Sequence, residues 1–231
     1  MTNEFIIICA PRSGSSCLAG ILHRLGVNMG DYWAPDHNPP YYPDQRLYED
    51  VDFYQYGVFS YYPVIGLANI LKPLILPILD EFPQHKKYEF QDLYKRKCYY
   101  NHSIKWGWKH PLTVFYLKHV IHMMDNPIVI HSYRNPIDIG ESINRTYDRR
   151  DGYDIACGFD DLIGNFFDCC EGRYSDKSTT YEFEKVKADP EGAIKDINKR
   201  FNLKANEEQK EAALKHIIPD STGGEDSDEV M

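Results

Sequence analysis

The sequence lacks the cysteine spacings that hold zinc or build a disulfide framework. None of the six cysteines in the 231 residues belongs to a CxxC pair, and two of the six are adjacent. This pattern is typical neither of zinc sites nor of small secreted domains. No signal-peptide pattern precedes Phe5, where an apolar run begins at once. These features predict a cytoplasmic protein.

A long uninterrupted hydrophobic run is also missing. The most apolar stretch in the middle of the chain, residues 58–79, is interrupted by three prolines and a lysine. A membrane-spanning helix needs about 20 consecutive, predominantly apolar residues. We therefore expect no membrane span.

An excess of positive charge is absent as well. The net charge is −9, from 26 Lys and Arg against 35 Asp and Glu, and five of the acids lie within residues 220–231. The rest of the chain is only mildly acidic, which argues against a nucleic-acid partner but not against a small anion in a local basic pocket. We predict a single domain over 1–219, with an insertion at about 30–102, and a disordered acidic tail over 220–231.

What the sequence does contain is an alternation of apolar runs and helix signals. Apolar runs predict strands at 5–9, 103–109, 127–133 and 178–184. Helical spacing and capping residues predict helices at 17–25, 111–124, 136–148, 162–170, from 190 and from 206. Strands that alternate with helices are typical of an α/β fold with a mostly parallel central sheet flanked by helices. The polar segment 84–102 is assigned no element.

Aromatic residues are concentrated in one segment, residues 30–62. It contains eight tyrosines, one tryptophan, two phenylalanines and four prolines, and they follow no clear period. We interpret it as an ordered aromatic insertion and expect residues 31–62 to form a pocket for a sugar or a hydroxylated aromatic molecule. The alternative is that these rings pack the insertion onto the sheet.

The turn between the first strand and the first helix, residues 10–17, has the composition of an anion-binding loop. Such a turn directs backbone N–H groups and the positive end of the helix dipole at one point. Gly14 allows close approach of the backbone, Arg12 adds a positive charge, and hydroxyl groups come from Ser13, Ser15 and Ser16. The segment is not a Walker A sequence, because its lysine is missing. The alternative is an ordinary serine-rich helix start.

A second candidate anion-binding segment lies where the strand 127–133 passes into a helix. Arg134 stands at this turn, and its guanidinium could grip a phosphate by two hydrogen bonds. Ser142 lies two helical turns further on and could donate another. Taken alone, Arg134 could equally form an ordinary salt bridge at the end of the strand.

Together the two segments resemble the sulfotransferase family that uses 3′-phosphoadenosine 5′-phosphosulfate (PAPS). The loop Pro11-Arg12-Ser13-Gly14-Ser15-Ser16 is similar to the family's 5′-phosphosulfate loop, and Arg134-Asn135-Pro136 through Ser142 to its R-x7-S motif for the 3′-phosphate. Two shorter matches are Trp108-Lys109-His110-Pro111 and Thr180-Tyr181-Glu182-Phe183-Glu184, the latter followed by Asp189-Pro190. The resemblance extends in order from residue 4 to about 203.

The resemblance implies a three-layer sandwich like that of P-loop NTPases and transfer of a sulfuryl group from PAPS. The acceptor would be a hydroxyl or amine of a small molecule or carbohydrate, 3′,5′-ADP would be released, and no metal is expected. The implied donor-binding residues are Pro11, Arg12, Ser13, Gly14, Ser15, Ser16, Cys17, Arg134, Ser142 and Tyr181. The loop N–H groups and Arg12 would stabilise the leaving phosphate, and Tyr181 would contact the adenine.

The resemblance also implies a general base for the acceptor. Glu49 is the first candidate, because relatives that use a glutamate place it in a similar segment, and His110 is the second. Lys109 would neutralise charge on the transferring group. The alternatives are that Glu49 is a surface acid and that His110 is a packing or helix-start residue.

The chain departs from many cytosolic members of that family in two ways. It has Cys17 where they have tryptophan, and it lacks their basic segment near the C-terminus, for which Arg145, Arg149 or Arg150 could compensate. Two other functions therefore stay open. One is a P-loop kinase-like phosphoryl transferase, and the other is a non-catalytic relative that binds a nucleotide or a partner.

Overall fold

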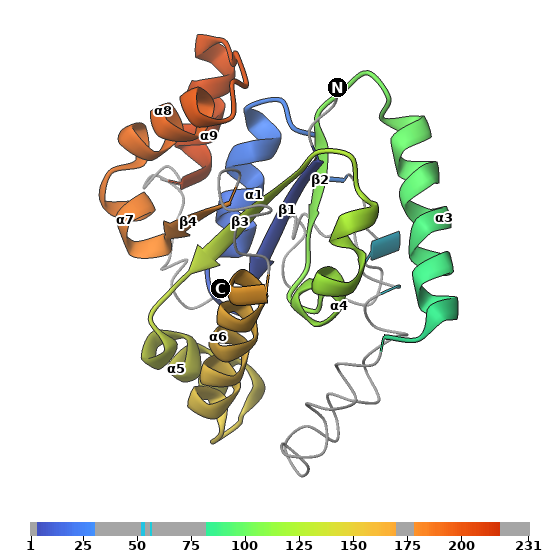
Figure 1. Cartoon of the computed structure of the whole chain (residues 1–231). Helices are drawn as coiled ribbons and strands as arrows, with labels where there is room; N and C mark the ends of the chain where they lie inside the picture. Colours follow the sequence, from blue (N-terminus) through green and yellow to red (C-terminus); the bar gives the residue numbers. More distant parts are fainter. Residues whose placement is uncertain (1–3, 31–51, 54–55, 57–81, 170–177, 218–231) are drawn as a thin grey trace.

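The computed structural model describes residues 4–30, 52–53, 56, 82–169 and 178–217 (Figure 1). Its centre is a four-stranded sheet with the strand order β2-β1-β3-β4, in which every neighbouring pair is parallel. The strands are β1 (Glu4–Cys9), β2 (Trp106–Lys109), β3 (Pro127–Tyr133) and β4 (Thr179–Glu182). The predicted α/β class with a parallel sheet is confirmed.

Helices cover both faces of this sheet and make three layers (Figure 1). Ile6 and Ile8 point into one apolar cluster and Phe5 and Ile7 into the other, because successive side chains of a strand alternate between its faces. The first face packs against α3 (Gln84–Tyr100), α4 (Thr113–Val120), α5 (Pro136–Tyr147) and α6 (Gly152–Cys169). The second packs against α1 (Ser15–Arg24), α8 (Pro190–Arg200) and α9 (Glu207–Ile217). The three-layer arrangement is therefore confirmed.

The predicted helix starts are built by local capping. The Asn135 side chain accepts a hydrogen bond from the Ile137 N–H at 2.9 Å, and Asp189 accepts one from the Gly192 N–H at 3.0 Å. Each cap is followed by a proline, whose missing N–H costs nothing in the first turn. These short-range bonds explain why α5 and α8 begin where their sequences predict.

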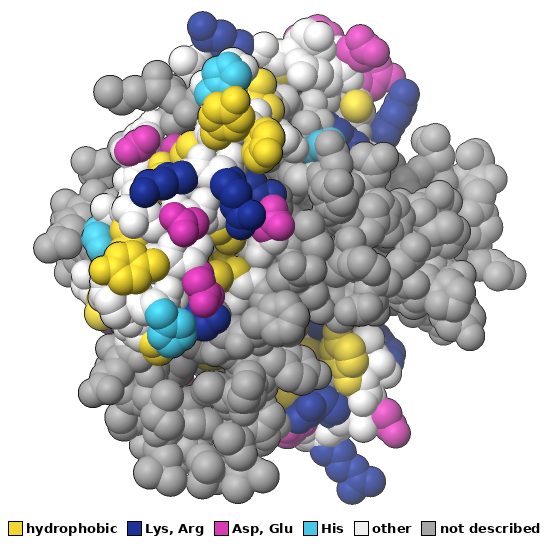
Figure 2. All heavy atoms as spheres, turned by 90° about the vertical axis from the view of Figure 1, so that its right-hand side faces the viewer, with side chains coloured by type: hydrophobic (Ala, Val, Ile, Leu, Met, Phe, Trp, Pro, Cys, Tyr) yellow, Lys and Arg dark blue, Asp and Glu magenta, His cyan; other side chains and the backbone are white. Residues whose placement is uncertain are grey.

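The helix α6 begins at Gly152, well before the predicted helix at 162–170, and two further elements differ from the expectation. The polar segment 84–102 is mainly the helix α3, which buries only Phe90, Leu93 and Tyr94 on the sheet. Figure 2 shows its outer face, where basic and acidic side chains are interspersed with exposed rings. The second difference is that the last strand ends at Glu182 and turns directly into α7 (Phe183–Ala188), whereas the apolar pattern predicts a strand through 184.

Most of the insertion and the whole acidic tail lie outside the described residues, and so does Glu49. Two aromatic residues of the insertion are described. Phe53 is fully buried and stacks on Trp108, with ring centroids 3.9 Å apart. Tyr56 is buried and donates to the Lys86 carbonyl at 2.9 Å. Both rings belong to the apolar cluster on one face of the sheet, so at these two positions they are core, as the alternative interpretation holds.

Within the described ranges, no helix is long and apolar enough to cross a membrane.

A single turn of 3-10 helix (Ile121–Met123) links α4 to the segment that precedes β3. The domain boundaries predicted at 219 and 220 fall outside what the structure describes.

Candidate anion-binding site

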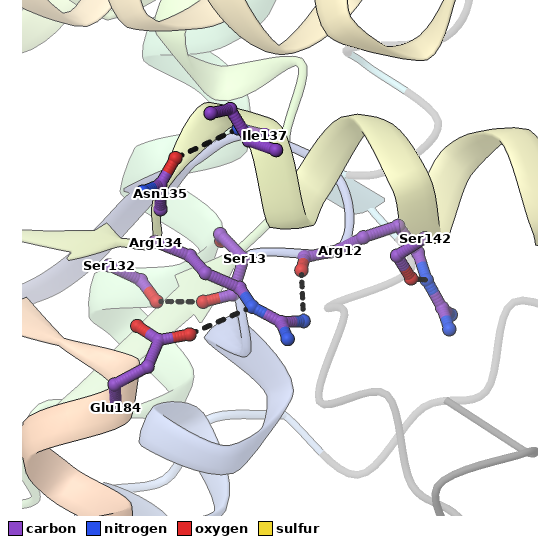
Figure 3. A network of polar contacts seen from close by, with 8 residues as sticks. All are labelled: Arg12, Ser13, Ser132, Arg134, Asn135, Ile137, Ser142 and Glu184. Carbon is purple, nitrogen blue, oxygen red and sulfur yellow. Dashed lines mark hydrogen bonds and ion pairs between the residues drawn. The ribbon is translucent and has the colours of Figure 1, made fainter. Parts of the chain in front are cut away.

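The two predicted anion-binding segments meet at the carboxyl ends of β1 and β3. These strands are neighbours, and Cys9 at the end of β1 pairs with Ser132 near the end of β3. The Ser132 hydroxyl donates to the Ser13 carbonyl at 3.2 Å and ties the loop to the strand (Figure 3). The carboxyl edge of a parallel α/β sheet is the usual place for a ligand in such folds, so the geometry supports a site at this edge.

The loop after β1 has the backbone of an anion cradle. Arg12 and Gly14 both have positive φ angles, 66° and 77°, and α1 begins immediately afterwards at Ser15. The Gly14 carbonyl accepts from the N–H groups of Cys17 at 3.0 Å and Leu18 at 3.3 Å. The first turn of α1 has no acidic side chain, so the positive end of its dipole is not compensated there.

Gly14 also has a steric reason to be glycine. A Cβ atom at this position would overlap the ring of Phe183, the first residue of α7. Together with the positive φ angle, this contact explains why the loop needs glycine here. It also shows that α7 packs directly on the loop.

Ser13 provides a buried polar atom that suits a ligand. Its side chain is fully buried, and within the described residues its Oγ has no hydrogen-bond partner. A buried hydroxyl without a partner costs about 1–3 kcal/mol relative to a satisfied one, and an anion oxygen in the loop would satisfy it. The residues present therefore fit a phosphate or sulfate group.

Arg12 and Ser142 join the two segments directly. The Nε of Arg12 donates to the Oγ of Ser142 at 3.0 Å, and Ser142 is almost completely buried on α5 (Figure 3). Residues predicted for two ends of one ligand are thus in contact, although 130 positions separate them in the sequence.

Arg134 lies at the same loop but is paired with an acid. Its Nη1 donates to the Arg12 carbonyl at 3.4 Å, and its Nε donates to Glu184 at 3.0 Å (Figure 3). Its guanidinium lies 5.1 Å from the centroid of the Phe183 ring. The salt bridge expected in the alternative interpretation of Arg134 is therefore present, and its predicted contact with a phosphate stays a prediction.

Lys109 and His110 lie at the end of β2, on the same edge of the sheet, and both are buried. The Leu112 N–H donates to the His110 Nδ1 at 3.3 Å, which makes Nδ1 an acceptor and assigns the proton of the neutral ring to Nε2. In this tautomer the Nε2–H can donate a hydrogen bond, while the nitrogen that could accept a proton, Nδ1, is already bound to the Leu112 N–H. The helix-start contact expected in the alternative interpretation of His110 is thus present.

Tyr181 lies on β4 beside Ser132. Its hydroxyl donates to Asp196 of α8 at 2.6 Å, and Asp196 also accepts from Arg200 at 3.2 Å. Burial, and secondarily the hydrogen bond to the carboxylate, raises the pKa of Tyr181. The polar end of the ring is therefore engaged by α8, and the predicted adenine contact stays a prediction.

Sequence reasoning missed three residues around the site: Phe183, Glu184 and Lys187. They belong to α7, the element whose start lies inside the predicted last strand. The alternation expected for a strand concealed Phe183 and Glu184, and Lys187 lies beyond that predicted strand. Their positions follow from the contacts with Gly14, with Arg134 and with the Phe183 ring. Arg149, one suggested replacement for a basic C-terminal segment, forms a two-bond pair with Asp151 at 2.7 and 2.8 Å.

A small hollow lies beside Arg134, between the end of β3 and the helices α5 and α6. His131 and Asp160 contribute to its wall. Burial lowers the pKa of His131 to about 4, so this ring is neutral at pH 7, and burial raises the pKa of Asp160.

In the described part of the chain, no group of three His, Cys, Asp or Glu residues is arranged to hold a metal.

No protein-family model matches the chain, and no curated protein sequence is significantly similar to it. Its fold does match solved structures. The sulfotransferase domain of the olefin synthase from Synechococcus PCC 7002 superposes with a TM-score of 0.55 at 18% identity, over 90% of this chain and 76% of that one.

Two further structures agree. A sulfotransferase of Mycobacterium tuberculosis H37Rv gives a TM-score of 0.51 at 14% identity, over 94% of this chain and 72% of that one. The sulfotransferase domain of the curacin biosynthetic pathway gives 0.53 at 14% identity, over 90% and 77%. The chain therefore has the fold of these sulfotransferases.

Proposed function

We propose that the protein is a sulfotransferase that takes its sulfuryl group from PAPS. The observation on which this rests is the direct contact of Arg12 with Ser142, at 3.0 Å. It joins a loop suited to one anionic group to a strand-to-helix turn suited to a second. A nucleotide with anionic groups at both its 3′ and 5′ positions matches such a site, and the likeness of the fold supports the same conclusion.

Each part of the site has a role in this proposal. The loop N–H groups, Arg12 and the buried Ser13 hydroxyl hold the 5′ side, while Arg134 and Ser142 hold the 3′-phosphate. When bound, PAPS supplies the sulfuryl group that is transferred to a hydroxyl or amine. The loop dipoles and Arg12 would stabilise the negative charge that grows on the departing phosphate side.

In this proposal Glu49 is the general base that removes the proton from the acceptor. The described geometry gives this assignment indirect support, since the His110 Nδ1 accepts from a backbone N–H and its Nε2 is left with the proton. Lys109, buried at the end of β2, offers a positive charge to the transferring group. His110 is the alternative base.

The acceptor in this proposal is a small molecule or a carbohydrate, and the setting is cytoplasmic. The aromatic segment 31–62 would form its pocket, next to Glu49. Hydrogen exchange tests this. If the amides of residues 31–62 become protected only when both 3′,5′-ADP and an acceptor are present, the pocket is supported. If they are fully protected without any ligand, the acceptor binds elsewhere.

Nucleotide selectivity tests the proposed donor against the other two functions. Thermal unfolding is followed with 3′,5′-ADP, ADP and ATP, each with and without Mg²⁺. We expect stabilisation by 3′,5′-ADP that does not depend on Mg²⁺, since ligand binding to the folded state raises its stability. Stabilisation by ATP only with Mg²⁺ would indicate a kinase-like enzyme, and no response to any nucleotide would favour a non-catalytic relative.

Transfer itself is then measured as release of 3′,5′-ADP from PAPS in the presence of candidate phenols, alcohols, sugars and amines. The Arg12→Ala variant serves as the control, because it removes the positive charge of the loop; its thermal midpoint without ligand is measured alongside. A nucleotide site without turnover on any acceptor class would contradict the proposed enzyme.

A further inference from the structure

Helix α7 forms a wall of the anion-binding loop that the sequence motifs do not include. It follows β4 without a connecting loop and lies at the edge of the sheet beside β4 and α8 (Figure 1). Its first side chain, Phe183, occupies the space beside the Cα of Gly14. Any charged group that α7 presents near this ring is therefore close to the loop.

Two cations lie next to the Phe183 ring. The guanidinium of Arg134 is 5.1 Å from the ring centroid, and the ammonium of Lys187 is 5.6 Å from it. Both distances are within the range of cation–π contacts. The ring thus holds Lys187 near the same loop that Arg134 contacts from β3.

The pairing of these cations differs. Arg134 is bound to Glu184 at 3.0 Å, and Lys185 of the same helix is bound to Glu182 at 2.6 Å. Among the residues that the structure describes, no carboxylate lies within ion-pair distance of Lys187. Its charge is therefore available to a ligand, whereas that of Arg134 is partly offset by Glu184.

The charge of Lys187 also acts on a residue in the first turn of α1. The pKa of the Cys17 thiol is raised by burial to about 11, and the charge of Lys187 is the main influence that opposes this rise. Cys17 is the third residue of α1, directly after the serines of the loop. Lys187 is therefore near enough to the first turn of α1 for its charge to act there, in agreement with its position beside the Phe183 ring.

We propose that Lys187 is a ligand-binding residue of this site and contacts a phosphate oxygen of the bound nucleotide. The inference rests on the proposed function. A nucleotide with two phosphate groups carries several negative charges. Arg12 and Arg134 do not balance them, because Arg134 is already paired with Glu184. An ammonium at the end of a flexible stem can reach a phosphate as a point charge.

The test compares two lysines of the same helix. Lys187→Ala, Lys187→Arg and Lys185→Ala are prepared, and the binding of 3′,5′-ADP is measured by calorimetry. We expect Lys187→Ala to weaken binding by about tenfold or more, as for loss of a charged hydrogen bond. Lys187→Arg should stay within about threefold of the unmodified protein, since the charge is kept. Lys185→Ala should change little, because this side chain is exposed and paired with Glu182.

The outcomes separate the two claims. If the unmodified protein binds 3′,5′-ADP and Lys187→Ala binds it as well as Lys185→Ala does, the role of Lys187 is wrong and the proposed function stands. If the unmodified protein does not bind 3′,5′-ADP, the proposed function is wrong and the role of Lys187 falls with it. Equal thermal midpoints of the three variants without ligand exclude an effect on folding.

Discussion

Arg12 donates its Nε–H to the hydroxyl of Ser142 across the boundary between the loop after β1 and the helix after β3. The contact exists because β1 and β3 are adjacent and parallel, so their carboxyl ends open at one edge of the sheet. Neither residue defines a site alone. Together they bring the guanidinium of the loop residue Arg12 into contact with a buried hydroxyl of α5, close to the N-terminus of α1.

Replacement of Arg134 by alanine should remove the preference of the protein for 3′,5′-ADP over 5′-AMP. In the proposed site this guanidinium binds the 3′-phosphate, and loss of a charged partner costs about 1.5–3 kcal/mol, a factor of roughly 10 to 100. Calorimetric titration of both nucleotides measures the ratio. An unchanged ratio in the variant would show that the 3′-phosphate binds elsewhere.

Replacement of Glu184 by glutamine should tighten the binding of 3′,5′-ADP. Glu184 accepts from the Arg134 Nε at 3.0 Å and offsets its charge, but the carboxylate is 44% exposed. An exposed ion pair is worth about 0–1 kcal/mol, so we expect a gain of up to about fivefold at low salt. The gain should shrink as salt is raised. Weaker binding in this variant would mean that Glu184 orients Arg134 for the ligand.

Replacement of Gly14 by alanine should destabilise the protein and displace α7 from the loop. The new Cβ would overlap the Phe183 ring, and the residue would have to adopt a φ angle of 77°. Left-handed backbone alone costs an alanine about 1 kcal/mol or more, and the overlap adds to it. Denaturant unfolding gives the change in the free energy of unfolding.

Gly158 of α6 is the matched control for this prediction. A Cβ there would meet no atom within 4 Å, and its φ angle is not positive. Gly158→Ala should therefore leave the protein equally stable or stabilise it by up to about 1 kcal/mol, as expected for glycine in a helix. Similar losses for both variants would show that the Gly14–Phe183 contact has no special role.

Replacement of Glu49 by glutamine should lower turnover by roughly 100-fold or more while the affinity for 3′,5′-ADP changes little. Glutamine keeps the size of the side chain but cannot accept the acceptor's proton. Steady-state rates and nucleotide binding are measured on the same preparation. A normal rate in this variant, together with a large loss in His110→Ala, would assign the base to His110.

Acid should destabilise the protein partly through His131. Its pKa is about 4 in the fold and 6.5 in the unfolded chain, because burial disfavours the charged ring. Between these values the unfolded chain binds a proton that the folded protein does not, so the free energy of unfolding falls as the pH is lowered from about 6.5 to about 4. The slope from one such group is about 1.4 kcal/mol per pH unit at most.

Unfolding by denaturant at several pH values checks this. In His131→Gln the fall between pH 6.5 and 4 should be shallower than in the unmodified protein. His216, whose pKa burial also lowers to about 4, contributes a second part of the slope and should remain. An unchanged slope in His131→Gln would show that the pKa of His131 is the same in the folded and the unfolded state.

The local elements could be predicted from the sequence because short-range chemistry decides them. The strand predicted at 127–133 has these same bounds in β3, since a β-branched run and the cap at Asn135 define both its character and its end. The positive φ angle of Gly14 is likewise a local reason for glycine, to which the tertiary contact with Phe183 adds a second. The class of site, a loop for an anion before a helix, followed from these features.

The composition of the site was decided by the tertiary structure. Which strands are neighbours depends on long-range pairing, and only the order β2-β1-β3-β4 brings Arg12 to Ser142 and Arg134 to the loop. Glu184 and Lys187 come to the same place because β4 pairs with β3 and the ring of Phe183 fits against Gly14. The sequence of a strand specifies which of its faces are apolar, but it does not specify which strand lies beside it. Contacts between residues of different strands and loops are therefore decided only when the sheet assembles and its two faces are packed.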